Sequence, residues 1–171
     1  MTGEDSKTHR SRAIRSVRCA VITVSDSRTA ANDTSGALMR ELLTAAGHEV
    51  VDSAILRDDP ETVRRRVRAW CDDPTCQVVL LTGGTGITAR DSTVEAIAEL
   101  FEKRLDGFGE LFRMLSYEQI GAAAMLSRAT AGACDRTLIF AMPGSTAAVR
   151  LAMEQLIVPD LGHLTAMVEA C

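Results

Sequence analysis

The sequence is poor in several features that mark common protein classes. Aromatic residues make up 4% of its 171 residues, with one tryptophan, one tyrosine and four prolines. No apolar run approaches the ~18 residues that a membrane-spanning helix needs. The opening "MTGEDSKTHRSRAIRS" is polar and lacks the apolar centre of a signal peptide. We therefore expect a cytoplasmic protein without a membrane span, with a single domain at 16–171 and, at 1–15, a mobile tail or an arm that docks on a neighbouring subunit.

Metal-binding and nucleic-acid-binding patterns are also missing. The cysteines form no CxxC pair, and no histidine stands near a cysteine or glutamate at the spacing of zinc ligands. Buried thiols in a reducing compartment are expected instead of disulfides or zinc. A net charge of −4 argues against nucleic acid as the main partner. The cysteines are Cys19, Cys71, Cys76, Cys134 and Cys171.

Three common enzyme signatures are absent. There is no GxxxxGK[ST], so the chain is not a P-loop NTPase, and no GxSxG elbow of a hydrolase. The first apolar run is followed by Ser25-Asp26-Ser27-Arg28 where a dinucleotide-binding protein would have GxGxxG.

Four apolar runs rich in β-branched residues organise the chain. They lie at 17–24, 48–56, 77–82 and 137–142, and helical patterns separate them. Strands that alternate with helices, several of them buried on both faces, are typical of a parallel sheet. The predicted fold class is therefore α/β, a three-layer α/β/α arrangement with a mostly parallel sheet.

Capping residues mark where the helices between these strands begin. The first helix, within 33–47, starts at an Asp or Thr cap and ends at a glycine. The second has Asp59 as N-cap and Pro60 at its first position. The third begins near Ser92, which we predict to form a capping box with Glu95.

The second half carries an insertion ahead of the last strand. Residues 106–126 predict an additional pair of helices, and 129–140 can hold a short extra strand with a turn at Asp135. From Ser145 onward the pattern is helical, with a break at Pro159.

Small polar loops follow all four predicted strands. In an open parallel sheet these carboxyl ends share one edge, where ligands bind at a reversal of strand order. Gly83-Gly84-Thr85-Gly86 and Pro143-Gly144-Ser145 both present bare backbone N–H groups and a following helix start, which suits an anion. Steric need alone also explains glycines at such turns, but two loops on one edge favour phosphate binding.

Carboxylates lie in the same loops. Asp58 and Asp91 each fall at this edge, with Asp26 and Asp59 nearby. Helix capping is the alternative explanation for Asp59 and Asp91. A helix terminus stabilises an anion by only ~0.3–1 kcal/mol, too little to hold a polyphosphate beside carboxylates. Mg²⁺, bound by one or two carboxylates and phosphate oxygens, resolves this conflict. The residues alone therefore predict a Mg²⁺-dependent nucleotide or polyphosphate site.

Several motifs in order resemble one known family. "TVSDS", "LLTGGTGITARDSTVEA" and "AMPGST" are similar to the MogA/MoaB proteins of molybdenum cofactor biosynthesis, and "GFGELFRMLSYEQIG" with "LSRATAG" resembles the MoaB branch. The resemblance covers about 17–157. It implies an α/β/α fold in trimers or hexamers, binding of molybdopterin, and Mg²⁺- and ATP-dependent adenylylation of its terminal phosphate. It also admits other molybdenum-cofactor enzymes as partners.

The resemblance assigns site residues by position. Its two essential acidic positions, catalytic and metal-holding, fall on Asp58 and Asp91. Arg57 and Val94 stand where the family often has proline, and we expect only small local effects. The implied substrate contacts are Ser25, Thr82, Gly83, Gly84, Thr85, Gly86, Gly144 and Ser145.

Two functions of different class share this pocket. One is a molybdopterin adenylyltransferase, and the other is an oligomeric molybdopterin-binding or carrier protein that does no chemistry. Glu110 and Arg113 are further candidates at the edge, although an ordinary helix surface or a subunit salt bridge explains them equally well. Apolar residues of the insertion indicate either a subunit contact or core packing: Phe108, Leu111, Phe112, Met114 and Leu115.

Overall fold

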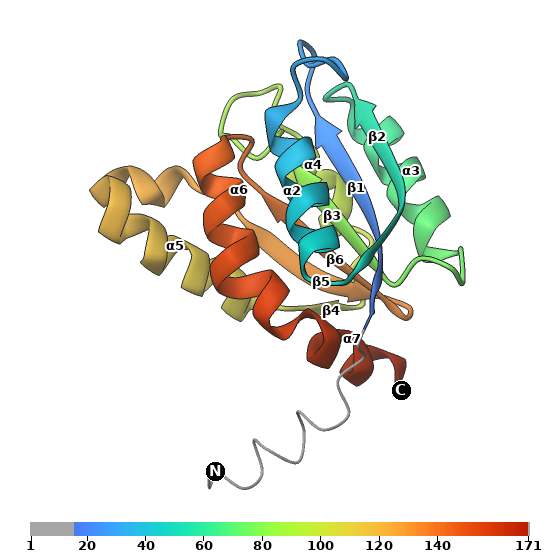
Figure 1. Cartoon of the computed structure of the whole chain (residues 1–171). Helices are drawn as coiled ribbons and strands as arrows, with labels where there is room; N and C mark the ends of the chain where they lie inside the picture. Colours follow the sequence, from blue (N-terminus) through green and yellow to red (C-terminus); the bar gives the residue numbers. More distant parts are fainter. Residues whose placement is uncertain (1–15, 171) are drawn as a thin grey trace, which may run out of the picture.

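A six-stranded sheet with strand order β2-β1-β3-β6-β5-β4 forms the centre of the molecule (Figure 1). The computed structural model describes residues 16–170, so the predicted tail at 1–15 and Cys171 lie outside the described residues. The strands are β1 (Arg18–Val24), β2 (Glu49–Leu56), β3 (Val78–Thr82), β4 (Lys103–Arg104), β5 (Thr130–Cys134) and β6 (Thr137–Met142).

Helical elements connect these strands. They are α2 (Thr34–Ala45), α3 (Pro60–Cys71), α4 (Thr93–Ala98), α5 (Asp106–Ile120), the 3-10 turns η1 (Gly121–Leu126), α6 (Thr146–Ala152), the π-helical η2 (Met153–Ile157), the 3-10 turn η3 (Val158–Asp160) and α7 (Leu161–Glu169). Within residues 16–170 no helix is long and apolar enough to cross a membrane.

Four of the strands run parallel, as predicted. β2, β1, β3 and β6 are parallel neighbours, whereas β5 and β4 add an antiparallel edge beside β6. Val21 lies between Ser53 on β2 and Leu80 on β3, and Leu80 lies opposite Phe140 on β6. Because the strands share one direction, their carboxyl ends meet at one edge.

Alternating side chains build a separate core on each face of the sheet. Val21 and Leu80 pack into a core completed by α2, α5, α6 and α7, which lie in front of the sheet in Figure 1. Their sequence neighbours Ile22 and Leu81 pack into a second core with α3 and α4. The two cores explain why β1 and β3 are apolar on both faces, and the predicted three-layer fold is confirmed.

Two predicted helix caps are confirmed and one is wrong. Asp33 caps α2 by accepting from the amide of Gly36, and Asp59 caps α3 ahead of Pro60. Ser92 precedes α4 but makes no side-chain cap hydrogen bond. The predicted capping box with Glu95 therefore does not form, because tertiary contacts described below engage both side chains.

The second half matches its prediction in outline. The predicted helix pair is α5 followed by 3-10 turns, and β5 and β6 form a hairpin that turns at Asp135, whose φ is +52°. The two-residue β4 was not predicted, because Lys103 and Arg104 are exposed and form no apolar run. At Pro159 the helical tail passes through a 3-10 turn before α7 begins.

The described cysteines are free thiols, as predicted. Cys19, Cys76 and Cys134 are buried, and Cys71 is partly buried.

Candidate functional site

The loops that follow the four parallel strands are tied together in pairs. The Ser25 amide donates to the Leu56 carbonyl over 2.8 Å, which joins the loops after β1 and β2. The Gly83 amide donates to the Met142 carbonyl over 3.1 Å, which joins the loops after β3 and β6. From β1 the chain continues to β2 on one side of it and then crosses to β3 on its other side. The order of the strands therefore reverses at this edge.

Glycine is required at the first two positions of the loop after β3. Gly83 has φ +96° and Gly84 has φ +64°, a region that side-chain-bearing residues rarely adopt. A Cβ on Gly83 would stand 2.2 Å from the carbonyl oxygen of Val24 at the end of β1. A Cβ on Gly144 would stand 3.3 Å from the Cα of Gly83. The loops after β1 and β3 thus approach closely enough to exclude a side chain at Gly83, and the loop after β6 packs tightly against them.

Asp58 reaches the glycine loop from the end of β2. Its Oδ1 accepts from the amide of Ser92 over 3.3 Å and from the Ser92 hydroxyl over 3.0 Å. A Cβ on Gly84 would stand 2.9 Å from Oδ2 of Asp58. The Ser92 contacts therefore orient the carboxylate so that it faces the bare backbone at Gly84.

Asp91 lies against the other end of the same loop. Its Oδ2 accepts from the amide of Thr88 over 2.9 Å and from the Thr88 hydroxyl over 2.5 Å. The Thr88 hydroxyl holds the pKa of Asp91 below its ordinary value, so the carboxylate stays ionised at neutral pH. A Cβ on Gly86 would stand 2.6 Å from Oδ2. Both predicted acidic residues therefore lie against the glycine loop.

Thr93 adds a buried hydroxyl that has no partner. The residue is fully buried, and Oγ1 makes no hydrogen bond. A Cβ on Gly84 would stand 2.0 Å from this oxygen. A buried hydroxyl without a partner costs about 1–3 kcal/mol. Thr93 Oγ1 and the Asp58 carboxylate thus both lie against the backbone of Gly84.

Arg128 fixes both ends of the loop and was not identified from the sequence. Its Nε donates to the Thr85 carbonyl over 3.0 Å, and a terminal nitrogen donates to the Asp91 carbonyl over 3.1 Å. The guanidinium also pairs with Glu95. The residue lies within "LSRATAG", but no local pattern shows that it reaches a loop about forty residues earlier.

Three predicted hydroxyl contacts are engaged within the loops. Ser25 Oγ accepts from the amide of Arg28 over 3.2 Å, and Ser145 Oγ caps α6 by accepting from the amide of Ala148 over 3.2 Å. Thr82 is fully buried, and its hydroxyl donates to the Pro143 carbonyl over 3.1 Å. In this structure these hydroxyls shape the loops, and their contact with substrate stays a prediction.

Asp26 connects further residues to the edge. Its Oδ1 accepts from the amide of Asp58 over 3.3 Å, and its Oδ2 pairs with the exposed side chain of Arg90 over 2.5 Å. The loop after β1 is thereby linked to the loops after β2 and β3.

The carboxylates do not form a metal cage made of protein alone. Residues 16–170 contain no group of three or more His, Cys, Asp or Glu side chains arranged to hold a metal ion. Mg²⁺ commonly takes one or two carboxylates and completes its shell with water and phosphate oxygens. The pair at this edge suits that mode of binding.

A cavity of about 440 Å³ is lined in part by Arg128, the residue that holds the glycine loop. Val94 and Arg128 line it on the loop side, and Glu110 and Arg113 line it from α5. Arg113 donates to the carbonyls of Ser127 and Ala129, each over 3.4 Å. Glu110 and Arg113 therefore lie on a wall of this cavity, next to the predicted site.

The fold is that of an α/β protein in which a glycine loop and two carboxylates meet at the carboxyl ends of the parallel strands. The profile of the family described as "Probable molybdopterin binding domain" matches residues 20–163. The chain belongs to this family.

Individual relatives of known sequence or structure support the same family. Molybdenum cofactor biosynthesis protein B of Bacillus cereus is 52% identical over 158 residues, 92% of this chain and 94% of that protein. A crystal structure of molybdenum cofactor biosynthesis protein B is similar with a TM-score of 0.89 at 51% identity, covering 91% of this chain and 98% of that one. The tungsten cofactor synthesizing protein MoaB from Pyrococcus furiosus has a TM-score of 0.81 at 38% identity, covering 91% and 99%. The predicted resemblance to the MogA/MoaB family is confirmed, and the chain is a molybdenum cofactor biosynthesis protein.

Proposed function

We propose that the protein adenylylates molybdopterin, with Mg²⁺ and ATP, at the edge where the four loops meet. One observation carries the proposal: two carboxylates, from separate loops, lie against a glycine loop whose backbone excludes side chains. The relatives support the pathway by name, and the geometry supports the phosphate and metal chemistry. We place the reaction in the cytoplasm, in keeping with the free thiols of Cys19, Cys71, Cys76 and Cys134.

The residues present fit a magnesium ion and a polyphosphate. Carboxylate oxygens of Asp58 and Asp91 are the hard ligands that Mg²⁺ prefers. The unpartnered hydroxyl of Thr93 beside Gly84 gives a phosphate oxygen a buried donor. Positive φ at Gly83 and Gly84 gives the loop a backbone conformation in which amide groups can turn toward a phosphate.

The proposed reaction is a phosphoryl-type transfer. An oxygen of the terminal phosphate of molybdopterin attacks the α-phosphorus of ATP, the bond from that phosphorus to the bridging oxygen breaks, and pyrophosphate leaves. The nucleophile needs no general base, because its second pKa of about 6 leaves it ionised at neutral pH. When bound, Mg²⁺ offsets phosphate charge.

The chain contributes chiefly by positioning. Asp58 and Asp91 would hold the metal, and the Thr93 hydroxyl would donate to a phosphate oxygen. Arg128 keeps the loop in the conformation that presents these groups, through its bonds to the Thr85 and Asp91 carbonyls. Fixed alignment of two bound reactants is a large share of the rate enhancement in such reactions.

A single-turnover assay tests the proposal. Purified protein is mixed with molybdopterin and Mg-ATP, and adenylylated pterin is quantified. Asp58→Asn and Asp91→Asn should each abolish product while pterin binding persists. Asp59→Asn is the matched control, because Asp59 caps α3 and should affect stability without affecting product.

The alternative function has a distinct outcome. Saturable pterin binding without product, and without binding of Mg-ATP, would leave an oligomeric binding or carrier protein. Absence of binding to either ligand would contradict both functions.

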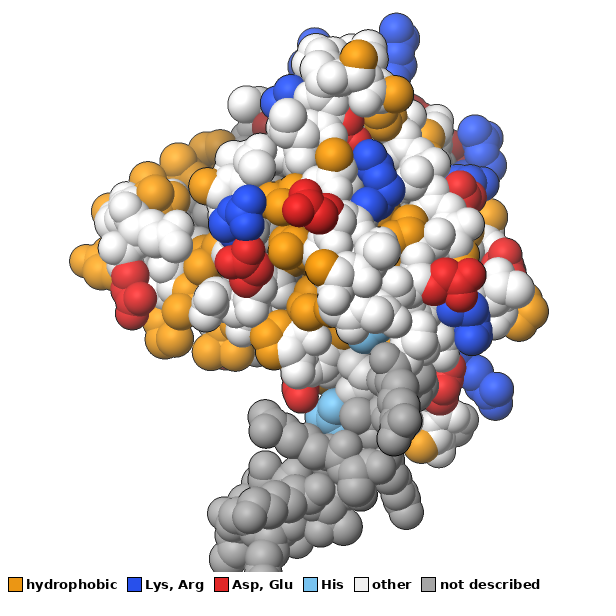
Figure 2. Space-filling model, viewed as in Figure 1, with side chains coloured by type: hydrophobic (Ala, Val, Ile, Leu, Met, Phe, Trp, Pro, Cys, Tyr) orange, Lys and Arg blue, Asp and Glu red, His pale blue; other side chains and the backbone are white. Residues whose placement is uncertain are grey.

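We also propose that the protein is a homo-oligomer joined through α5 and η1. Apolar side chains gather over this part of the surface, on the left in Figure 2. Phe108 and Phe112 pack in the core. Of the two explanations offered for the apolar residues of the insertion, core packing therefore applies to these two, and a subunit contact remains for the exposed ones. Patches of this kind commonly mark protein interfaces. The exposed members are Leu111, Met114, Tyr117, Ile120, Met125 and Leu126.

Sedimentation analysis tests the contact. Met114→Lys, on an exposed side chain, should lower the oligomeric state. Met167→Lys is the control, because Met167 is equally exposed but lies on α7. An unchanged mass for Met114→Lys would contradict the proposed contact.

A further inference from the structure

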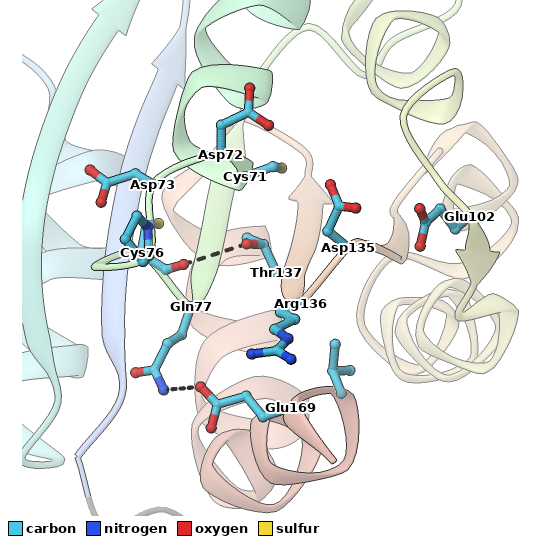
Figure 3. A pocket seen from close by; sticks show the side chains of 12 residues that line it. Cys71, Asp72, Asp73, Cys76, Gln77, Glu102, Asp135, Arg136, Thr137 and Glu169 are labelled. Atoms are coloured by element: carbon cyan, nitrogen blue, oxygen red, sulfur yellow. Dashed lines mark hydrogen bonds between the residues drawn. The ribbon is translucent and has the colours of Figure 1, made fainter. Parts of the chain in front are cut away.

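A cavity of about 760 Å³ lies at the opposite end of the sheet from the proposed catalytic edge. Figure 3 shows its walls, which come from the end of α3, the starts of β3 and β6, and α7. Cys71 and Cys76 both line it. The adenylylation chemistry proposed above uses none of these residues.

Cys71 and Cys134 lie close together beside this cavity. Cys71 is the last residue of α3, is partly exposed, and packs against the core cluster that includes Cys134. Cys134 ends β5 and is fully buried. The two thiols interact, because, in addition to burial, the neighbouring Cys134 thiol helps to raise the pKa of Cys71. Residues 63 positions apart in the sequence thus place two sulfur atoms side by side.

Arg68 supplies a fixed positive charge to this pair. One terminal nitrogen donates to Cys134 Sγ over 3.4 Å. The other pairs with Asp72 over 2.9 Å and with Asp135 over 3.1 Å. Two carboxylates therefore hold the guanidinium against the sulfur of Cys134. A cation in this position stabilises a thiolate, the form in which cysteine reacts.

We propose that Cys71 and Cys134 form a reversible disulfide, with a hydroperoxide as the oxidant that reaches Cys71 through the cavity. The thiolate of Cys71 attacks a peroxide oxygen, the O–O bond breaks, and water leaves after protonation, giving a sulfenic acid. The thiolate of Cys134 then attacks the sulfur of Cys71 and displaces the hydroxyl group as a second water. Two thiols and one hydrogen peroxide become one disulfide and two waters, a two-electron oxidation of the sulfur pair.

The exposures of the two cysteines fix their order of reaction. Cys71 meets the oxidant because it lines the cavity, and Cys134 resolves the sulfenic acid because it is buried beside Arg68. Burial raises the pKa of both thiols, Asp135 and Glu102 raise the pKa of Cys134 further, and Arg68 opposes these effects. Oxidation therefore proceeds through a small thiolate fraction and should accelerate as pH rises.

Cys76 is the competing partner, because it lines the same cavity. Its thiol donates to the Val78 carbonyl over 3.5 Å, and burial raises its pKa to about 11. Cys76 is the weaker candidate, because its thiol is engaged with β3 and the hydrogen bond from Arg68 goes to Cys134.

Mass spectrometry of the full-length protein tests the pair. The protein is treated with hydrogen peroxide at neutral and mildly alkaline pH, and free thiols are then alkylated. Trypsin and Asp-N digestion separates Cys71 from Cys76, because Asp72 and Asp73 lie between them. We expect a peptide containing Cys71 linked to one containing Cys134, formed faster at the higher pH and lost after dithiothreitol.

Three variants sharpen the result. Cys71→Ser should abolish the linked peptide, and Cys76→Ser should leave it intact. Arg68→Gln should slow its formation several-fold at neutral pH, whereas Arg65→Gln, an exposed change on the same helix, should not. A Cys71–Cys76 link, stepwise oxidation of Cys71 without any link, or an unchanged rate in Arg68→Gln would each overturn the proposal. Its outcome does not depend on adenylyltransferase activity.

Discussion

The Nε of Arg128 lies 3.0 Å from the carbonyl oxygen of Thr85 and donates a hydrogen bond to it. A second nitrogen of the same guanidinium binds the carbonyl of Asp91, six residues farther along the loop. The planar group therefore spans the glycine loop and sets the separation of its ends.

Arg128→Lys should destabilise the protein by about 1–3 kcal/mol, because one ammonium cannot replace both carbonyl contacts. Urea unfolding measures the change. Glu95→Gln is the control: it removes the charge partner on the exposed side of Arg128 and should cost under about 1 kcal/mol. Equal stability of Arg128→Lys and the unmodified protein would show that charge alone is sufficient.

Thr93→Val should stabilise the free protein and weaken its binding of Mg-ATP. Replacing a buried, unpartnered hydroxyl with a methyl group of similar size should raise the free energy of unfolding by about 1 kcal/mol. Thr82→Val is the matched change at a threonine whose hydroxyl has a partner, and it should lower that free energy by about 1 kcal/mol. Urea unfolding and titration calorimetry separate the two effects.

The two ways in which this prediction can fail point to different errors. If the unmodified protein does not bind Mg-ATP, the proposed function is wrong. If it binds Mg-ATP and Thr93→Val binds equally well, only the role given to the Thr93 hydroxyl is wrong.

Gly83→Ala should destabilise the protein by more than about 1 kcal/mol, because it combines a positive φ with a collision at the Val24 carbonyl. Gly107→Ala offers the contrast: a Cβ there meets open space on α5, so stability should stay level or rise by up to about 1 kcal/mol. Thermal unfolding of both variants gives the comparison. A neutral Gly83→Ala would mean that the loop can move away from β1.

His48 should make the protein less stable in mild acid. Burial lowers its pKa from 6.5, and its Nδ1 accepts a hydrogen bond from the Val17 amide over 3.2 Å. A lowered histidine pKa means that the fold favours the neutral ring, so its contribution is present above pH 6.5 and is lost as pH falls through the lowered value. His48→Gln should flatten this decline in the free energy of unfolding. Urea titrations across that range provide the measurement, and parallel slopes in both proteins would contradict it.

The layer arrangement and the meeting of the four strand-end loops could be predicted because they depend on local signals. Apolar runs at 17–24, 77–82 and 137–142 identify β1, β3 and β6, and parallel strands must place their following loops at one edge. Asp33 and Asp59 cap their helices through residues three positions away. These relations lie within a few residues of one another, so pattern alone reveals them.

The remainder depends on contacts between distant residues. Ser92 meets the criteria for a helix cap, yet its hydroxyl donates to Asp58, 34 positions earlier. Glu95 pairs with Arg128 rather than with its own helix terminus. Helix-capping propensity reflects only interactions with neighbouring backbone groups, and a partner from elsewhere in the fold can override it. For the same reason, sequence gave no indication of the unpartnered Thr93 hydroxyl.

The contact of Gly83 with Val24 on one side and Gly144 on the other has a consequence for biosynthesis. These residues are about 60 positions apart along the chain in each direction, so a growing polypeptide cannot bring the three loops together until β6 has docked beside β3. Contacts of such long range also slow folding relative to helical bundles. The proposed binding of Mg-ATP would therefore test completed folding: a nascent or partly unfolded chain, whatever helices it has formed, should not bind Mg-ATP.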